Sequence, residues 1–344
     1  MKNNEIILFI TFLSCLLFGC NISNETPDKI VLPDAIQLKG QTIQIDNNML
    51  NPMGMCISDE KLIIFDDVQS GLFKVFNIPE LAYEFSWGSR GKGPEEFLVI
   101  NNNYIRSFRT ELELLDNGIL KRLAIMNDRL KIKSIKRLPI MENPINGLQR
   151  INDSIYFADN FFSDGSNEHL IINVNTGKIL NKFGNYPNGN LKIKDNHERY
   201  QIYHKSSISD PASDKFVVFY TYFGKIKIYN NTGELIKSII LDDKEIEMVS
   251  LEKREQNKTY FALPYATKNY FSILRINKTD EEIVKDINNY KPELLIWDWN
   301  GNLINRYKLD KPLTRYAISE KYQKLYGTFI MKDDEIYIFD LPNQ

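Results

Sequence analysis

Residues 293–308 read Glu-Leu-Leu-Ile-Trp-Asp-Trp-Asn-Gly-Asn-Leu-Ile-Asn-Arg-Tyr-Lys, and this stretch decides the fold. A short apolar run at 293–298 ends at the turn 299–301, and a second, alternating run follows at 302–308. Asn and Gly tolerate the positive φ that a tight hairpin requires. The stretch therefore predicts two short antiparallel strands joined by a turn.

The same pattern recurs along the whole chain, which points to internal repeats. Two further copies of the turn are Asn175-Thr-Gly177 and Asn231-Thr-Gly233. Each of six units has an earlier apolar run; these runs end at residues 66, 116, 159, 220, 275 and 329, with spacings of 50, 43, 61, 55 and 54. One more apolar run precedes each unit, so each repeat contains four strands.

Four-stranded units repeated radially predict a β-propeller. We expect an all-β, six-bladed β-propeller with four-stranded blades. The last repeat has only three strands, and the alternating stretch Ile36–Ile45 has no partner in the first repeat. We therefore expect this N-terminal strand to join the last blade and close the ring, which removes strand edges that would otherwise pair with other chains. Two β-sandwiches are the alternative, and residues 279–290 are expected to form a short helical insertion.

The N-terminus carries a short apolar leader that ends at a cysteine. Residues 6–18 are apolar, and Leu17-Phe18-Gly19-Cys20 follows. The run is shorter than the roughly 20 residues of a spanning helix and fits the roughly 7–15 residues of a signal sequence. It resembles a bacterial lipoprotein signal, in which the leader is cut before a cysteine that then carries lipid. We predict a signal peptide at 1–19, a lipid-anchored flexible tether at 20–35 that begins with Cys20, and a propeller domain at 36–344.

This leader predicts a cell-envelope protein that is lipid-anchored to a membrane. We expect the outer membrane, while the few acidic residues after the cysteine leave the leaflet open. An ordinary cleaved signal peptide with a coincidental cysteine is the alternative. The mature chain has one more cysteine, Cys56, so no intrachain disulfide can form. Its apolar neighbours predict that Cys56 is buried.

Composition and motifs point away from several functions. The net charge is −2, which gives no reason to expect a nucleic-acid partner. The chain lacks zinc, calcium and nucleophile-elbow motifs, so we assign no cofactor, no metal and no catalytic residue. The glycine-rich turn at 88–93 does not have the spacing of a phosphate loop and is interpreted as a crossing between blades.

Other polar features have ordinary structural interpretations. We interpret His169, His197 and His204 as surface or turn histidines. In the basic stretch 131–137 lysines alternate with isoleucines, which is typical of an outer strand with one charged face.

Several segments resemble known propellers. Residues 85–97 (FSWGSRGKGPEEF) resemble the blade junction of NHL-type propellers, with a glycine-rich turn followed by Gly-Pro and Phe. Together with the Leu-Ile-Trp-Asp-Trp-Asn-Gly stretch that ends at Gly301, the segment at 307–313 and the leader, they make the mature chain similar to TolB-like six-bladed propeller lipoproteins of Gram-negative anaerobes. The resemblance implies an exported, membrane-tethered propeller with a binding role, and it carries no catalytic residues to this chain.

The function hypothesis is a monomeric binding or scaffold lipoprotein for a protein, peptide or glycan partner. The alternative is a channel-sited lyase or hydrolase of the propeller type. Arg106, Arg150 and Arg315 fall in or just after the predicted inner strands of blades two, three and six. If their guanidinium groups converge on the channel, they would bind a carboxylate or phosphate. Salt bridges or solvent exposure at strand ends is the other interpretation of these arginines.

Overall fold

The apolar runs that mark the repeat form strands that are buried on both faces. In β5 (Lys61–Asp66) every residue after Lys61 is buried. Successive side chains of a strand point to opposite faces, so Leu62 and Ile64 pack against one neighbouring sheet while Ile63 and Phe65 pack against the other. A short, continuous apolar run is what such a doubly covered strand needs.

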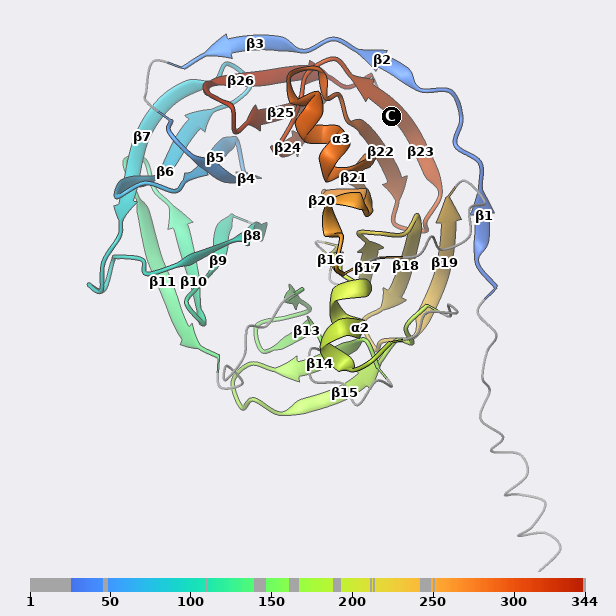
Figure 1. The fold of residues 1–344 in the computed structure, drawn as a ribbon. Coiled ribbons are helices and arrows are strands. Elements are labelled where there is room, and N and C mark those ends of the chain that lie inside the picture. The colour runs from blue at the N-terminus through green and yellow to red at the C-terminus, as the bar shows by residue number, and fades with distance from the viewer. Residues whose placement is uncertain are drawn as a thin grey trace, which may run out of the picture.

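These strands belong to six sheets arranged around a central axis, as the computed structural model shows (Figure 1). It describes residues 26–45, 49–108, 110–138, 147–160, 167–187, 193–210, 212, 214–241, 249 and 251–342. The prediction of an all-β, six-bladed propeller with four-stranded blades is confirmed.

Each blade is an antiparallel meander whose first strand lies nearest the axis. Blade one contains β4 (Pro52–Ser58), β5, β6 (Ser70–Asn77) and β7 (Ala82–Ser89). Blade two contains β8 (Ile100–Phe108), β9 (Glu111–Asp116), β10 (Ile119–Ile125) and β11 (Leu130–Arg137). Blade three contains β12 (Gln149–Arg150), β13 (Ile155–Asp159), β14 (His169–Asn173) and β15 (Ile179–Phe183). Blade four contains β16 (Lys205–Ser209), β17 (Lys215–Tyr220), β18 (Lys225–Asn230) and β19 (Leu235–Leu241). Blade five contains β20 (Lys258–Ala266), β21 (Tyr270–Thr279), β22 (Glu293–Asp298) and β23 (Leu303–Leu309). Blade six contains β24 (Arg315–Ser319), β25 (Lys324–Phe329), β26 (Lys332–Asp340) and β3 (Gln41–Gln44).

The N-terminal segment closes the ring and then continues beyond the closure. As predicted, the last blade is completed from the N-terminal side, because β3 pairs antiparallel with β26. The expected single strand at 36–45 is divided into two: β2 (Ile36–Leu38) instead pairs parallel with β23 of blade five. Upstream, β1 (Asp28–Ile30) pairs parallel with β19 of blade four. Asp28–Ile30 is therefore part of the folded ring rather than of a flexible tether.

A glycine explains where this N-terminal belt is divided. Gly40 lies between β2 and β3, at the passage from blade five to blade six. A Cβ atom at this position would lie 2.7 Å from the ring of Phe339, so only glycine fits so close to β26. The backbone N–H of Gly40 donates to the carboxylate of Asp310 at 2.7 Å, which fixes the belt to the end of β23.

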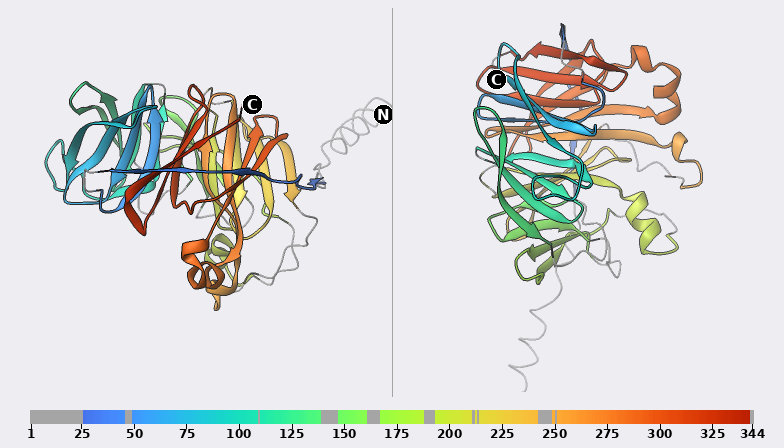
Figure 2. Two further views of the ribbon diagram at one scale, coloured as in Figure 1. Left: turned by 90° about the horizontal axis from the view of Figure 1, so that it is seen from above. Right: turned by 90° about the vertical axis from the view of Figure 1, so that its left-hand side faces the viewer.

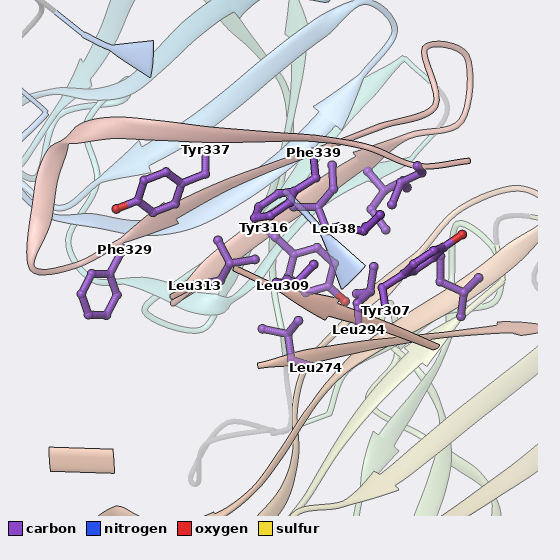
Figure 3. Close-up of a cluster of buried hydrophobic side chains, with 14 of the residues drawn as sticks. Leu38, Leu274, Leu294, Tyr307, Leu309, Leu313, Tyr316, Phe329, Tyr337 and Phe339 are labelled. Carbon is purple, nitrogen blue, oxygen red and sulfur yellow. The ribbon is translucent and has the colours of Figure 1, made fainter. Parts of the chain in front are cut away.

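The core consists of six clusters of buried apolar side chains, one between each pair of neighbouring blades. Figure 3 shows the cluster between blades five and six, where Leu38 of the belt lies beside Leu309 and Phe339. The belt is therefore held by apolar packing as well as by backbone hydrogen bonds.

The two short α-helices lie on one face of the ring (Figure 2). The expected insertion at 279–290 is confirmed as α3 (Asp280–Lys285) and the 3₁₀ turn η2 (Ile287–Asn289) between β21 and β22. The helix α2 (Asn196–Ile202), between blades three and four, was not expected from the sequence, and it begins where the Asp195 side chain accepts from the N–H of Glu198. A further 3₁₀ turn, η1 (Arg254–Gln256), precedes β20.

In an antiparallel meander, the connections between blades and those between second and third strands share one end of the strands. We call this end, which carries both helices, the insertion face. The opposite end carries the turns that include Gly177, Gly233 and Gly301, and we call it the turn face. Gly301 has φ of 76°, as expected for the tight turn predicted from the sequence.

Candidate functional site

The connections on the insertion face expose more aliphatic side chains than the connections on the turn face. Val99 is 65% exposed and Met331 is 60% exposed, and both lie in connections on this face. The others are Leu50, Leu98, Val284 and Ile330. Among the described connections of the turn face, only Met126 is an exposed large hydrophobic residue. Exposed apolar side chains gathered on one face mark a candidate interaction surface.

Below the insertion face, buried carboxylates hold the chain where it enters the inner strands. Asp116, the last residue of β9, accepts from the backbone N–H groups of Leu98 and Val99 at 2.9 Å each. Its second oxygen lies 2.8 Å from the ammonium group of Lys121 on β10. That lysine also donates to the carbonyl of Glu96 at 2.7 Å, so one ion pair fixes the whole crossing into blade two.

Blade one repeats this arrangement. Asp66, the last residue of β5, accepts from the N–H groups of Leu50 and Asn51 at 3.1 and 2.5 Å. Its other carboxylate oxygen lies 3.4 Å from the ammonium group of Lys74 on β6. The aspartates therefore have a structural role, because they satisfy backbone groups that would otherwise be buried without partners.

Blade four departs from this pattern. Its second strand ends in Tyr220 where blades one and two have aspartate. The hydroxyl of Tyr220 donates to the carboxylate of Glu168, which comes from blade three, at 2.6 Å. The ammonium groups of Lys205 and Lys227 lie 3.6 and 3.8 Å from the same carboxylate. All of these side chains are buried, so a carboxylate of one blade holds two lysines and a tyrosine of the next.

His169 lies beside this cluster and is fully buried, so its interpretation as a surface or turn histidine is wrong. Its Nδ1 atom is 3.3 Å from Asp159, and its ring packs against Phe183, Phe216 and Tyr229. Burial lowers the pKa of His169 despite the neighbouring carboxylates, so the ring is neutral near pH 7. The other two histidines are exposed: His197 lies on α2, and His204 contacts Thr221 Oγ1 at 2.8 Å.

Lys205 stays charged within the cluster. Burial by itself would lower the pKa of Lys205, but Glu168 and Asp159 outweigh that effect and raise the pKa above the usual lysine value. Its ammonium group makes no hydrogen bond to any described residue. Sequence reasoning missed this group because its members are scattered over two blades, and only their burial shows that they act together.

The structure places two of the three predicted ligand-binding arginines around one carboxylate. Arg106 stands opposite Glu113 in the register of β8 and β9, and its guanidinium lies over the Tyr104 ring at 4.7 Å. The guanidinium of Arg150 lies 3.6 Å from Glu113 and 3.7 Å from the centre of the Phe108 ring. Arg150 is also paired with Asp153.

Arg315 is held elsewhere. It begins β24 of blade six, and its guanidinium donates to the backbone carbonyls of Met53 and Thr314. Its partners are therefore main-chain groups, whereas Arg150 pairs with carboxylates. The hypothesis of an anion site shared by the three arginines stays a prediction. Cys20, the residue predicted to carry lipid, lies outside the described residues.

Three further predictions are confirmed. The glycine-rich turn forms the crossing between β7 and β8, where Phe97 packs on Phe73 and Trp87. The basic stretch lies in β11, the outer strand of blade two. Cys56 is buried in β4, and burial raises the pKa of its thiol to about 12.

Comparison with protein families matches residues 31–321 to the family described as TolB-like 6-blade propeller-like. The chain belongs to this TolB-like propeller family. None of the curated proteins matches it in sequence. Family membership fixes the six-bladed architecture and leaves the chemistry to the site itself.

Two solved structures from Bacteroides share the fold. One is a protein of Bacteroides fragilis described as exported, with a TM-score of 0.53 and 12% identity over 91% of this chain and 99% of that one. The other is a DUF4221-family protein of Bacteroides vulgatus, with a TM-score of 0.58 and 10% identity over 89% of this chain and 97% of that one.

The described residues contain no helix that is both long and apolar enough to cross a membrane. No group of three or more His, Cys, Asp and Glu side chains among them is arranged to hold a metal ion.

Proposed function

We propose that this TolB-like propeller is an exported lipoprotein that binds a protein partner through its insertion face. The asymmetry between the two faces carries the proposal: the helices and nearly all exposed aliphatic residues of the connections lie on one side. A propeller face built from loops on a rigid ring is a suitable binding surface, because the blades hold the loops in place.

The chemistry of this face favours a protein over the other partners considered. Val99, Val284 and Met331 present aliphatic surface, which gains most from burial against another apolar surface. The buried aspartates beneath Leu50 and Leu98 hold the backbone of these connections in position. A surface that is already ordered loses less conformational entropy on binding.

Export and anchoring rest on the leader. The apolar run at 6–18 and the Gly19-Cys20 pair support cleavage before Cys20 and lipid attachment to its thiol. The similar B. fragilis protein is described as exported, which agrees with export of this chain. We also propose that the membrane that holds the lipid is the outer membrane.

Site-specific photo-cross-linking in intact cells tests the binding face. A photoreactive residue at Val99 or at Met331 is expected to trap the same protein, whereas one at Met126 on the turn face is expected to trap none. Equal capture from Met126 would contradict the proposal. For the anchor, cells given a radiolabelled fatty acid should incorporate it into the wild-type protein and not into Cys20→Ala; no incorporation into the wild-type protein would refute lipidation.

A further inference from the structure

A repeated pair of aliphatic residues, exposed at every position except the half-buried Leu303, follows the turns of blades three, four and five. The pairs are Ile179–Leu180, Leu235–Ile236 and Leu303–Ile304, each beginning two residues after the glycine of its turn. Leu180 and Ile236 are both 49% exposed, at the start of outer strands where a propeller has no further blade to cover them.

Hydrogen bonds between blades join these pairs into one surface. The side chain of Asn181 on β15 donates to the carbonyl of Thr232 at 3.0 Å, which connects blade three to the turn of blade four. Lys237 on β19 donates to the carbonyl of Gly301 at 3.1 Å, which connects blade four to the turn of blade five. We call residues 179–180, 235–236 and 303–304 the rim ridge.

The N-terminal belt begins at the centre of this ridge. Asp28 pairs with Ile239, and Ile30 pairs with Leu241, in a parallel register. Because the pairing is parallel, the chain upstream of Asp28 leads back toward the start of β19, where Leu235 and Ile236 lie. An ion pair of 3.6 Å between Asp28 and Lys237 fixes this direction.

The distance from the lipid to this point is short. Five residues lie between Cys20 and Thr26, the first described residue, so six residue-to-residue steps of about 3.5 Å in a fully extended chain span about 21 Å in all. A lipid on Cys20 therefore keeps the edge of blade four close to the membrane surface.

We propose that the rim ridge lies against the membrane that holds the lipid. This inference rests on the proposed lipidation of Cys20. The aliphatic pairs enter the interfacial region, while the exposed Lys178 and Lys182 extend their ammonium groups toward the headgroups. The ridge sets orientation rather than affinity, because lipid chains already supply the anchoring.

Among the described residues, the outer strands on the other side of the ring carry no such pair of exposed aliphatic side chains, and Ile135 on β11 is exposed alone. Blade one, opposite blade four in the ring, exposes Tyr83 on its outer strand, and blade two carries the lysine-rich β11. Contact through the rim ridge turns the turn face toward the bilayer and leaves the insertion face directed away from it. The proposed partner-binding face therefore stays accessible in the anchored protein.

Fluorescence quenching by lipids tests this orientation. Lipidated protein carrying Ile236→Cys, Tyr83→Cys or Met331→Cys is labelled with a fluorophore and reconstituted into phosphatidylethanolamine–phosphatidylglycerol vesicles that contain headgroup-nitroxide lipids. Cys56 does not compete for the label, because its thiol is buried and protonated. We expect several-fold stronger quenching at position 236 than at 83 or 331, and we expect Leu235→Lys in the Ile236→Cys protein to reduce it.

The outcomes separate the inference from the proposed function. Mass spectrometry of the N-terminal peptide first shows whether Cys20 carries lipid; its absence would refute the anchoring and, with it, the ridge contact. Lipid on Cys20 with equal quenching at the three positions, or with strongest quenching at 331, would overturn the ridge contact alone. A dimer in detergent that Leu235→Lys dissociates would also overturn it, because the ridge would then be a contact between two copies.

Discussion

The chain enters blade two and blade four in different ways. At blade two, Asp116 and Lys121 belong to the same blade, and together they bind the incoming backbone. At blade four, Lys227 makes the equivalent contact to the incoming carbonyl of Asn185 at 2.6 Å, but the carboxylate is Glu168 of blade three. The first arrangement fixes a crossing within one blade, and the second also ties two blades to each other.

Blade four has Tyr220 at the strand end where blades one and two have aspartate, and this makes the difference possible. A tyrosine hydroxyl can donate to a carboxylate, whereas an aspartate there would add a second buried negative charge beside Glu168. Blade four therefore depends on its neighbour for charge balance.

Glu168→Gln should cause the largest loss of stability. It leaves the buried Lys205 and Lys227 without their shared carboxylate, and breaking a buried ion pair in this way costs about 3–5 kcal/mol. Chemical denaturation measures the free energy of unfolding, and the exposed Glu95→Gln is the matched control. A loss no larger than that of the control would mean that the cluster does not join the blades.

Asp116→Asn should destabilise the protein less than Glu168→Gln. The Asn side-chain oxygen can still accept from the N–H groups of Leu98 and Val99, so the main loss is the ion pair with Lys121, for which we expect about 2–3 kcal/mol. The same denaturation experiment, with the exposed Asp128→Asn as control, gives the value. The distinction between the two crossings fails if this variant is destabilised as much as Glu168→Gln.

Removing Lys205 should partly rescue the loss of Glu168. Adding Lys205→Met to Glu168→Gln should recover about 1–3 kcal/mol, because residues of one buried network are energetically coupled. Adding Lys205→Met to Asp116→Asn should give effects that sum to within about 0.5 kcal/mol, as for distant sites. Strict additivity in both pairs would argue against a shared network at blade four.

Lowering the pH should reduce the free energy of unfolding through His169. Since burial holds its native pKa below the usual value, the unfolded chain binds a proton first as pH falls. The free energy of unfolding should therefore fall below about pH 6.5, by at most about 1.4 kcal/mol per pH unit from this group. His169→Phe, which keeps a ring between Phe183 and Phe216, should flatten the pH profile between its native pKa and pH 6.5; an unchanged slope would exclude His169.

Much of the fold was predictable because local signals agreed with it. The turn at 299–301 and the apolar run of β22 carry their own turn chemistry and burial pattern, which need no distant partner to be recognised. The pairing of β3 with β26 followed from counting strands. The pairing of β1 did not, because a three-residue strand containing Asp28 and Lys29 has no alternating pattern to mark it.

The buried cluster at blade four was not predictable for a related reason. Glu168 and His169 are adjacent in a sequence whose neighbourhood looks like a polar loop, and the lysine partners of Glu168 lie more than thirty residues away on β16 and β18. A polar residue in sequence is normally exposed. Only the packing of blade three on blade four shows that these groups are desolvated and paired.

The closure of the last blade also bears on when the ring can form. The hydrogen bond between Gln44 and Glu335 joins residues 291 positions apart. During synthesis, β3 is made among the first strands of the ring, yet its partner β26 is the last, so the early strand must wait for almost the whole chain. A fragment that stops short of β26 leaves β3 without its partner and removes Tyr337 and Phe339 from the cluster that covers blade five, and such exposed edges invite aggregation or proteolysis. Ring closure thus acts as a check that the chain has been completed.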